Sequence, residues 1–576
     1  MIGTIALSWI IFAACVVALT ILNWFVVRFL SDTRLSRFAQ ERKDKRLPEL
    51  VTTLGLTVTI VAIFLIPVDI YSVSDAAGLS HDAHAHLSEA VKVLYYVLYA
   101  TILVFVFVII PFTYFFYEEV GEDVTCGGRV FAGCKYTIFL VLVVVVLLIV
   151  GIFVSGSPPD TKNKDYKKYV EDVLDTENKG EASINFAFAC GAMLGYVIVL
   201  TYTAYGLSAF PLSWIKGKRN LKEEAADVES SLAITREKRR AVSSRYLSQE
   251  RRVSSRDEAT ISLLNEQERV LTTKQQKLAA ANGCWGRFLR LLAPFRFLLG
   301  IFFFLVTLLF MISLILTNID KILHSECGAK CGYALTQPKK WNPLDTCLVL
   351  LSKYFPLDYA LVALGILYFY FVTLSGISHI GIRVLWIKLY KVKARATKPQ
   401  GLLIATIMMM FALLAFNMLA MTLAPQYVSY GYQTYKVTNT TTIQSAEIAA
   451  LEEDLRDALS SVSSAASSAA SSASASSQHS ASSSSSGGGT ITHTETKTCD
   501  LSSPPEECHM TQLATVFNRI TMKISFFGLV FYYAIWLFVA FFLLGLVIAL
   551  LRKRASNATV DSSDEEDESD DDDLRR

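Results

Sequence analysis

Nine long apolar runs constrain this chain more than any other feature of its sequence. A bilayer core about 30 Å thick requires roughly 20 mostly apolar residues per helix. Such runs lie near 5–28, 50–73, 92–116, 135–154, 184–212, 294–317, 357–386, 401–423 and 524–551. Of the 576 residues, 52% are hydrophobic and only 18% are charged, whereas soluble proteins have about 25% charged residues. The sequence therefore predicts an all-α polytopic membrane protein with nine transmembrane helices.

The charge of the connecting loops predicts how these helices are oriented. The loops that follow the first, fifth, seventh and ninth runs are rich in Lys and Arg, which is typical of cytosolic loops. The first run lacks a basic leader and a small-residue cleavage site, so we expect it to be a retained helix. The N-terminus is then lumenal and the C-terminus cytosolic. A lysine cluster at 161–169 opposes this assignment, because it falls in a loop that becomes lumenal.

Other loops carry features of an oxidising and glycosylating compartment. The loop after the sixth run holds Cys327 and Cys331, and the loop before the ninth holds Cys499 and Cys508 together with the sequon at Asn439. Disulfides and N-linked glycans form on the exoplasmic side of a membrane. We therefore expect Asn439 to be glycosylated and Cys499 and Cys508 to form a disulfide, with Cys327 and Cys331 as a second candidate pair.

The runs and loops divide the chain into six regions. They are five transmembrane helices (1–215), a cytosolic helical loop (216–292), transmembrane helices six to eight with a lumenal cysteine-bearing loop (293–426), a lumenal glycosylated loop with a Ser/Ala-rich insert (427–515), the ninth transmembrane helix (516–551) and an acidic cytosolic tail (552–576). The Lys, Arg, Glu and Leu pattern of the second region predicts a helical hairpin. Its surface is either a solvated charged face or a docking site for a partner.

Motif searches argue against an enzyme. The chain contains no GxxxxGK[ST] phosphate loop, so it cannot drive transport with its own nucleotide hydrolysis, and it contains neither GxSxG nor HExxH. Its net charge of +2 gives no indication of nucleic-acid binding. The stretch HDAHAH (81–86) could bind a metal or titrate in an acidic compartment, although a solvated loop is the alternative. We expect no metal site and no permanently bound cofactor.

Two apolar runs share a Pro-x-Asp interruption, FLIPVDIY (64–71) and YFPLDYAL (354–361). In the nine-helix topology both lie at the lumenal membrane rim. Asp358 would lie in the first turn of its helix, where the dipole stabilises an acid by about 0.3–1 kcal/mol. Asp69 would face the negative end of its helix, so either that helix breaks at Pro67 or Asp69 has a partner. As a hypothesis, the two carboxylates flank a lumenal mouth where a polar cargo or a partner chain docks.

Several stretches together resemble one known family. They include YFFYEE (114–119), TYTAYGLSAFPL (201–212), GIRVLWIKLYKV (381–392), LAPQYVSYG (423–431) and the Cys-x8-Cys pair before the last run. In order and spacing they resemble the lysosomal cobalamin transporter family of limb-region-type membrane proteins. The resemblance implies a multi-pass lysosomal membrane glycoprotein required for export of cobalamin, its cargo, from lysosome to cytosol. It also implies an ATP-binding-cassette half-transporter as partner. The short N-terminus and the Ser/Ala insert depart from the family pattern.

The polar residues of the apolar runs allow two interpretations. A carrier needs a polar pathway across the membrane, and only the fifth and seventh runs offer one. Its candidate residues are Thr201, Tyr202, Thr203, Tyr205, Ser375, Ser378 and His379. Helix packing by small and hydroxyl residues is the alternative interpretation.

A receptor or endocytic adaptor is the other functional class, because YEEV (117–120) matches a sorting signal. The acidic tail is either a solvated end or a substrate for an acidophilic kinase.

Overall fold

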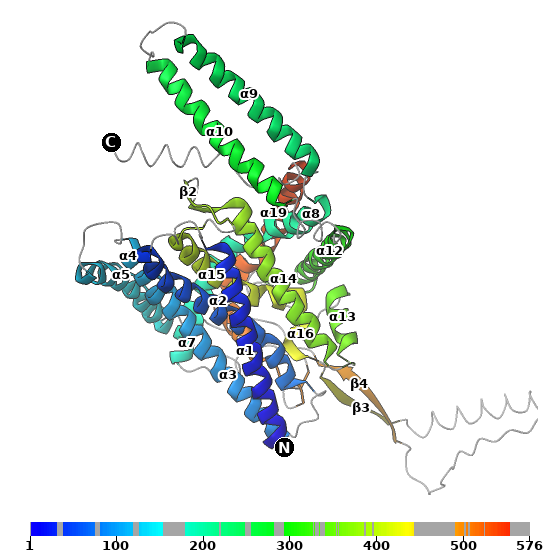
Figure 1. Ribbon diagram of the computed structural model, residues 1–576. Coiled ribbons are helices and arrows are strands. Elements are labelled where there is room, and N and C mark those ends of the chain that lie inside the picture. The colour runs from blue at the N-terminus through cyan, green and yellow to red at the C-terminus, as the bar shows by residue number, and fades with distance from the viewer. Residues whose placement is uncertain are drawn as a thin grey trace, which may run out of the picture.

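The computed structural model is a bundle of long helices with two small sheets (Figure 1). The residues that it describes are 2–31, 39–74, 81–118, 126–153, 179–217, 221–247, 255–281, 293–325, 328, 333, 340–352, 354, 356–384, 387–393, 397–431, 433–442, 490–499, 503–504, 507–523 and 525–552. Within these residues, nine helical segments are long and apolar enough to cross a membrane. The all-α polytopic prediction is therefore confirmed.

The nine membrane helices follow the apolar runs closely. Seven are single helices: α1 (Ile2–Leu30), α2 (Ala39–Val73), α5 (Cys126–Phe153), α12 (Ala293–His324), α14 (Leu357–Ile380), α15 (Pro399–Leu423) and α19 (Ser525–Leu551). The other two contain a π-helical turn. One is built from α3 (His81–Val104), η3 (Phe105–Ile109) and α4 (Ile110–Glu118), and the other from α7 (Lys179–Ile198), η5 (Val199–Thr203) and α8 (Ala204–Lys216).

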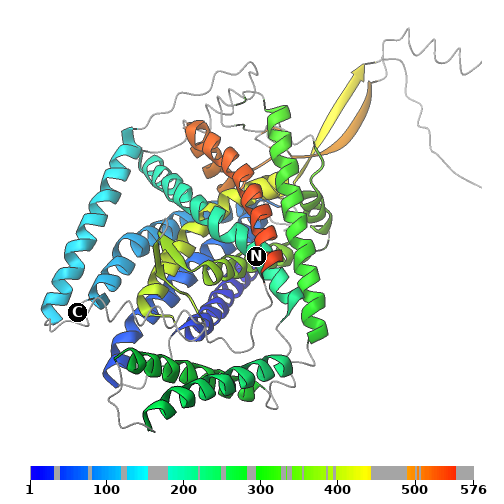
Figure 2. The ribbon, with the colours of Figure 1, turned by 90° about the horizontal axis from the view of Figure 1, so that it is seen from above.

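Helix α15 forms the centre of the bundle and α2 lies against it (Figure 2). In the apolar window of α15, 83% of the residues are buried, and in that of α2, 72%. Only 11% of the corresponding window of α5 is buried, and Figure 2 shows α5 (cyan) at the edge of the bundle. Since α5 is as apolar as the central helices, its exposed face suits contact with lipid.

Short elements cover the two ends of the bundle. At one end lie α13 (Pro343–Leu351), α16 (Pro425–Tyr430), α18 (Gln512–Lys523) and the sheet of β3 (Thr434–Thr442) and β4 (Thr490–Thr498). We call this end the disulfide side. At the other end, α9 (Leu221–Leu247) and α10 (Ser255–Ala281) pair as the expected helical hairpin. We call it the hairpin side. Figure 1 shows β3–β4 and α9–α10 at opposite ends, with the start of α1 on the disulfide side.

Two sequence predictions need correction. The seventh run was expected to remain helical from 357 to 386, but α14 ends at Ile380 because Gly381 has a φ of 77°, which favours glycine and breaks a helix. The chain then forms the antiparallel pair β1 (Ile382–Val384) and β2 (Ile387–Tyr390). The stretch 81–86, expected to be a loop, is helical, since α3 begins at His81.

Candidate functional site

Three buried carboxylates meet two short helices on the disulfide side. Asp69 belongs to α2, Asp345 to α13 and Asp358 to α14, and their exposed fractions are 1%, 6% and 2%. A carboxylate is costly to bury unless hydrogen bonds satisfy it. Each of the three accepts at least one hydrogen bond from α16 or α18, and we call the three the carboxylate cluster.

Asp69 caps the start of α18. Its Oδ1 accepts the backbone N–H of Gln512 at 3.0 Å, and its Oδ2 accepts that of Leu513 at 2.9 Å. The first N–H groups of a helix have no partner within the helix, and the positive end of the dipole favours an anion there. Of the two alternatives, a helix break at Pro67 or a partner for Asp69, the structure shows the partner. Helix α2 continues through Pro67 without a break, and Asp69 has a partner 443 residues away.

Asp345 does the same for α16. Its carboxylate accepts the backbone N–H groups of Gln426 at 3.3 Å and Tyr427 at 2.9 Å. Burial raises the pKa of Asp345 to about 6, although these two hydrogen bonds act in the opposite direction. Sequence reasoning missed this residue. The signal was available, because Pro343-Leu344-Asp345 at the start of α13 repeats the Pro356-Leu357-Asp358 at the start of α14.

Asp358 contacts the side chain of Tyr427, the residue whose backbone N–H donates to Asp345. Asp358 lies in the first turn of α14, as expected. Its Oδ2 accepts the hydroxyl proton of Tyr427 at 2.7 Å, while its Oδ1 is buried without a hydrogen-bond partner among the described residues. Burial, and then the bond to Asp358, raises the pKa of the fully buried Tyr427. Asp358 therefore does more than meet the dipole of its own helix, since it also links α14 to α16.

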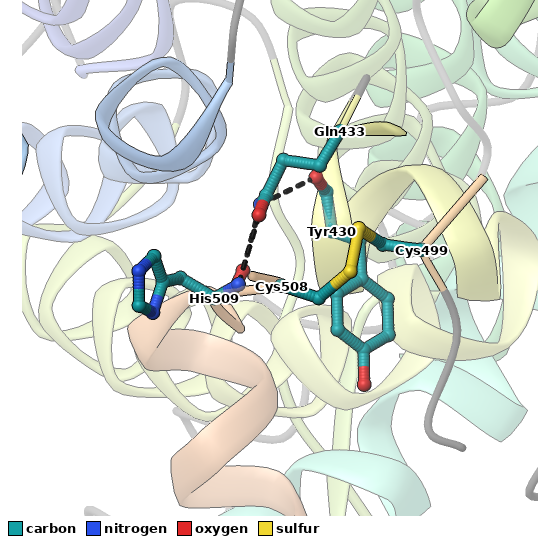
Figure 3. The surroundings of a disulfide bond; sticks show 5 residues. All are labelled: Tyr430, Gln433, Cys499, Cys508 and His509. Carbon is teal, nitrogen blue, oxygen red and sulfur yellow. Dashed lines mark hydrogen bonds between the residues drawn. A yellow bond between two sulfur atoms is a disulfide. The ribbon is translucent and has the colours of Figure 1, made fainter. Parts of the chain in front are cut away.

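A disulfide and an amide side chain hold the segments around α16 and α18 together. Cys499 and Cys508 form a disulfide, with their Cα atoms 5.8 Å apart. Gln433 donates to the carbonyl oxygens of Tyr430 at 2.8 Å and His509 at 2.7 Å, and accepts the His509 N–H at 2.8 Å (Figure 3). The Cys499 N–H in turn donates to the Gln433 carbonyl at 3.0 Å. These bonds fix the chain on both sides of the disulfide.

Thr511 then joins the two short helices directly. Its N–H donates to the Ser429 carbonyl at 2.9 Å and its hydroxyl to the Val428 carbonyl at 2.8 Å. Helices α16 and α18 thus form one cap, which we call the disulfide-side cap. Carboxylates from α2, α13 and α14 fasten it to the bundle. In this arrangement Asp69 and Asp358 are occupied by groups of the chain itself rather than exposed at an open mouth.

Some of the polar residues of the fifth and seventh runs lie where η5 and α8 pack against α14, whereas Thr201, Ser378 and His379 are exposed. Thr203 and Thr373 share a hydrogen bond of 2.9 Å between their hydroxyl groups. A Cβ at Gly376 would lie 2.0 Å from the Tyr202 carbonyl oxygen, and one at Gly206 would lie 2.2 Å from a carbonyl oxygen of α14. Small residues that let helix backbones approach this closely are typical of membrane helix packing. The geometry therefore favours the packing interpretation for Tyr202 and Thr203.

The remaining candidates are described only in part. Asn439 lies in β3, where its backbone pairs with His493. Among the described residues, no group of three or more His, Cys, Asp or Glu side chains could hold a metal ion. Outside the described residues are Cys327, Cys331, the lysine cluster 161–169, the Ser/Ala insert 460–489, the acidic tail 561–573 and the side chains of 81–85.

The fold and the disulfide-side cap define a polytopic helical membrane protein. Residues 8–284 match the LMBR1-like membrane protein family. A Dictyostelium discoideum protein named probable lysosomal cobalamin transporter is 35% identical over 559 residues, which cover 96% of this chain and 97% of that protein. No solved structure matches the chain.

Two further relatives extend the comparison to animals. A Nematostella vectensis protein of the same name is 34% identical over 564 residues, 96% of this chain and 95% of its own length. The Homo sapiens lysosomal cobalamin transport escort protein LMBD1 is 30% identical over 564 residues, covering 96% and 94% of the two chains. The chain belongs to the LMBR1-like lysosomal cobalamin transporter family, and it is a multi-pass protein of the lysosomal membrane.

Proposed function

We propose that this protein is required for cobalamin to leave the lysosome for the cytosol, as the escort or a component of an ATP-binding-cassette half-transporter. The observation that carries this proposal is the likeness over 96% of the chain to proteins named for cobalamin transport and its escort. The chain has no phosphate loop. A nucleotide-hydrolysing subunit therefore has to be a different chain, and cobalamin is a cargo rather than a resident cofactor.

The packing of the membrane helices supports an escort over a carrier. A carrier for a large polar cargo needs polar groups that line a pathway. In the described spans, Thr203 and Thr373 bond to each other, and Gly376 brings the backbones of α14 and η5 into contact. Thr203, one of the residues that a carrier could use, is thus engaged in holding two helices together.

We place the disulfide side in the lumen and the hairpin side in the cytosol. The sequon at Asn439 and the cysteine pair support this orientation, as do the basic loops. Region 427–515 is then lumenal and region 216–292 cytosolic. In this orientation, Asp69 and Asp358 serve the function by holding the disulfide-side cap in place, where it presents a lumenal surface to the partner.

Cells lacking the protein test the proposal. Lysosomes isolated after feeding with labelled cobalamin should retain the label, and re-expression of the wild-type chain should release it. Normal lysosomal cobalamin combined with altered uptake of a receptor ligand would instead support the receptor or adaptor class. The comparison separates the two classes because only the first predicts cargo trapped behind the lysosomal membrane.

A second experiment separates escort from carrier. The Thr203→Val and Thr373→Val double variant keeps the shape of the packing contact but removes both hydroxyl groups. An escort should still support cobalamin release with this variant, whereas a carrier that uses these hydroxyls should lose it. Purified wild-type protein reconstituted alone in liposomes should not concentrate cobalamin. Accumulation under a proton gradient would overturn the escort proposal.

A further inference from the structure

The hairpin carries a basic cluster near the far end of α9. Within one and a half turns, α9 has four cationic side chains and one acidic residue, Glu237. The four are Arg236, Lys238, Arg239 and Arg240. All are exposed except Arg239, which is half-buried. We call these four residues the basic cluster.

The opposite helix of the hairpin neutralises only part of this charge. Glu268 of α10 pairs with Arg236 at 2.8 Å and with Arg239 at 2.7 Å. The hydrogen bond from Arg236, with the charges of Arg239 and Arg240, lowers the pKa of Glu268. This carboxylate is therefore already shared between two arginines. Lys238 and Arg240 leave the cluster with two positive charges more than Glu237 and Glu268 can balance.

The strongest opposite charge in the chain lies in its C-terminal tail. Residues 561–573 contain ten Asp or Glu residues and no Lys or Arg. The tail follows α19, which ends at Leu551 on the hairpin side of the bundle. The last described residues before the acidic run therefore lie at the same end of the molecule as the basic cluster, whichever way the protein is inserted in the membrane.

A lysine clamp fixes the start of the tail beside the base of the hairpin. Lys216, the last residue of α8, donates from Nζ to the carbonyl oxygens of Ala549 at 2.8 Å, Leu550 at 2.7 Å and Arg552 at 2.9 Å. Helix α9 begins at Leu221, only five residues after Lys216. The C-terminal carbonyl groups of a helix favour such a cation. The tail and the hairpin thus start from one anchored point.

The tail is long enough to reach the cluster from this point. Along α9, the 20 residues from Leu221 to Arg240 span about 30 Å at 1.5 Å per residue. Asp561 follows Arg552 by nine positions, and an extended chain of that length covers up to about 30 Å. An extended linker of this length therefore allows the acidic run to reach the basic cluster.

We infer that the acidic tail 561–573 binds the basic cluster of α9 within the same chain. The tether gives the tail an effective concentration in the millimolar range at the cluster. Because the contact depends on exposed charges, salt weakens it. A bound tail covers the most cationic part of the hairpin and so keeps other anionic surfaces away from it. Phosphorylation of Ser562, Ser563 or Ser569 adds charge to the tail and tightens the contact.

A competition experiment on the full chain tests the inference. A fluorescent peptide of residues 558–576 is added to purified protein in neutral detergent at low salt, and its binding is followed by fluorescence anisotropy. The wild-type chain should bind it weakly, because its own tail occupies the cluster. A variant with the ten acidic residues changed to Asn and Gln should bind the peptide at least tenfold more tightly. Binding should fall again when salt is raised to 0.5 M.

Two charge-matched variants in the neutral-tail background locate the contact. Lys238→Gln with Arg240→Gln should lose most of the peptide binding. Arg269→Gln with Lys274→Gln, which removes the same charge from α10, should retain it. Equal binding by the wild-type and neutral-tail proteins overturns the inference, and so does equal binding by the two double variants. Binding of the cluster to anionic lipid vesicles but not to the peptide also overturns it, because the occupant is then the membrane surface.

Discussion

Replacing Gly376 by Ala tests the closest helix contact in the bundle. The added Cβ would lie 2.0 Å from the Tyr202 carbonyl oxygen and 2.8 Å from its carbon, whereas carbon atoms in ordinary contact are about 3.5 Å or more apart. Helix α14 therefore has to move more than about 1 Å away from η5. Overpacking of this kind costs about 1–3 kcal/mol and occasionally more. We expect the loss to reach the upper part of that range, because the obstacle is backbone that cannot rotate away.

Gly365 provides the matched control within the same helix. A Cβ there would meet only the Phe310 ring, at 3.9 Å, so Gly365→Ala should add helix propensity of up to about 1 kcal/mol without a clash. The two Gly→Ala variants should then differ by about 3 kcal/mol or more in the free energy of unfolding. The midpoint of thermal unfolding, followed by intrinsic fluorescence in detergent, measures the difference. Equal midpoints for the two variants would refute the argument that α14 packs backbone to backbone against η5.

Four further changes test the disulfide side. Asp69→Ala should lower the free energy of unfolding by about 2–4 kcal/mol, because two buried N–H groups of α18 lose their acceptor. An Asp69→Ala protein that reaches the lysosome and unfolds at the wild-type midpoint would contradict this role. Burial raises the pKa of Asp345 to about 6 from 3.8, so the folded state binds this proton more tightly and stability should fall by up to about 3 kcal/mol as pH rises from about 3 to about 7. An Asp345→Asn variant should lack that part of the pH dependence. Mapping of non-reduced peptides should recover Cys499 joined to Cys508, and changing both to Ser should cost about 2–3 kcal/mol; recovery of free thiols would end this prediction. Glycosidase should reduce the mass of the wild-type protein but not of an Asn439→Gln variant, and no mass change in either would count against the proposed orientation.

The membrane helices could be predicted from the sequence almost completely. Each apolar run satisfies its own backbone hydrogen bonds as a helix in lipid, so a span is a local property of about 20 residues. The helical hairpin was predictable for the same reason, since its pattern of charged and apolar residues is local. Where the prediction of a span failed, at Gly381, the cause was a single backbone conformation with positive φ, which the hydropathy of the surrounding run does not report.

The carboxylate cluster could not be predicted in the same way. The sequence indicated that Asp69 was in an unfavourable place for an acid and therefore needed either a helix break or a partner. It could not indicate which, because the N–H groups that Asp69 accepts belong to Gln512 and Leu513, more than 440 residues away. The hypothesis for Asp358 included only the dipole of its own helix. It could not include the hydrogen bond from Tyr427, because Tyr427 belongs to α16, a distant segment of the chain.

Hydropathy along the chain was sufficient to identify the segments that cross the membrane and the chemical type of the residues at their ends. Which helix each of those residues serves became clear only from the packing of distant segments. The physical reason is one of range: hydrophobic burial and backbone hydrogen bonding in a membrane helix are satisfied within one segment. A buried carboxylate is satisfied only by donors that the packing of distant segments brings to it, as α2 and α18 show around Asp69.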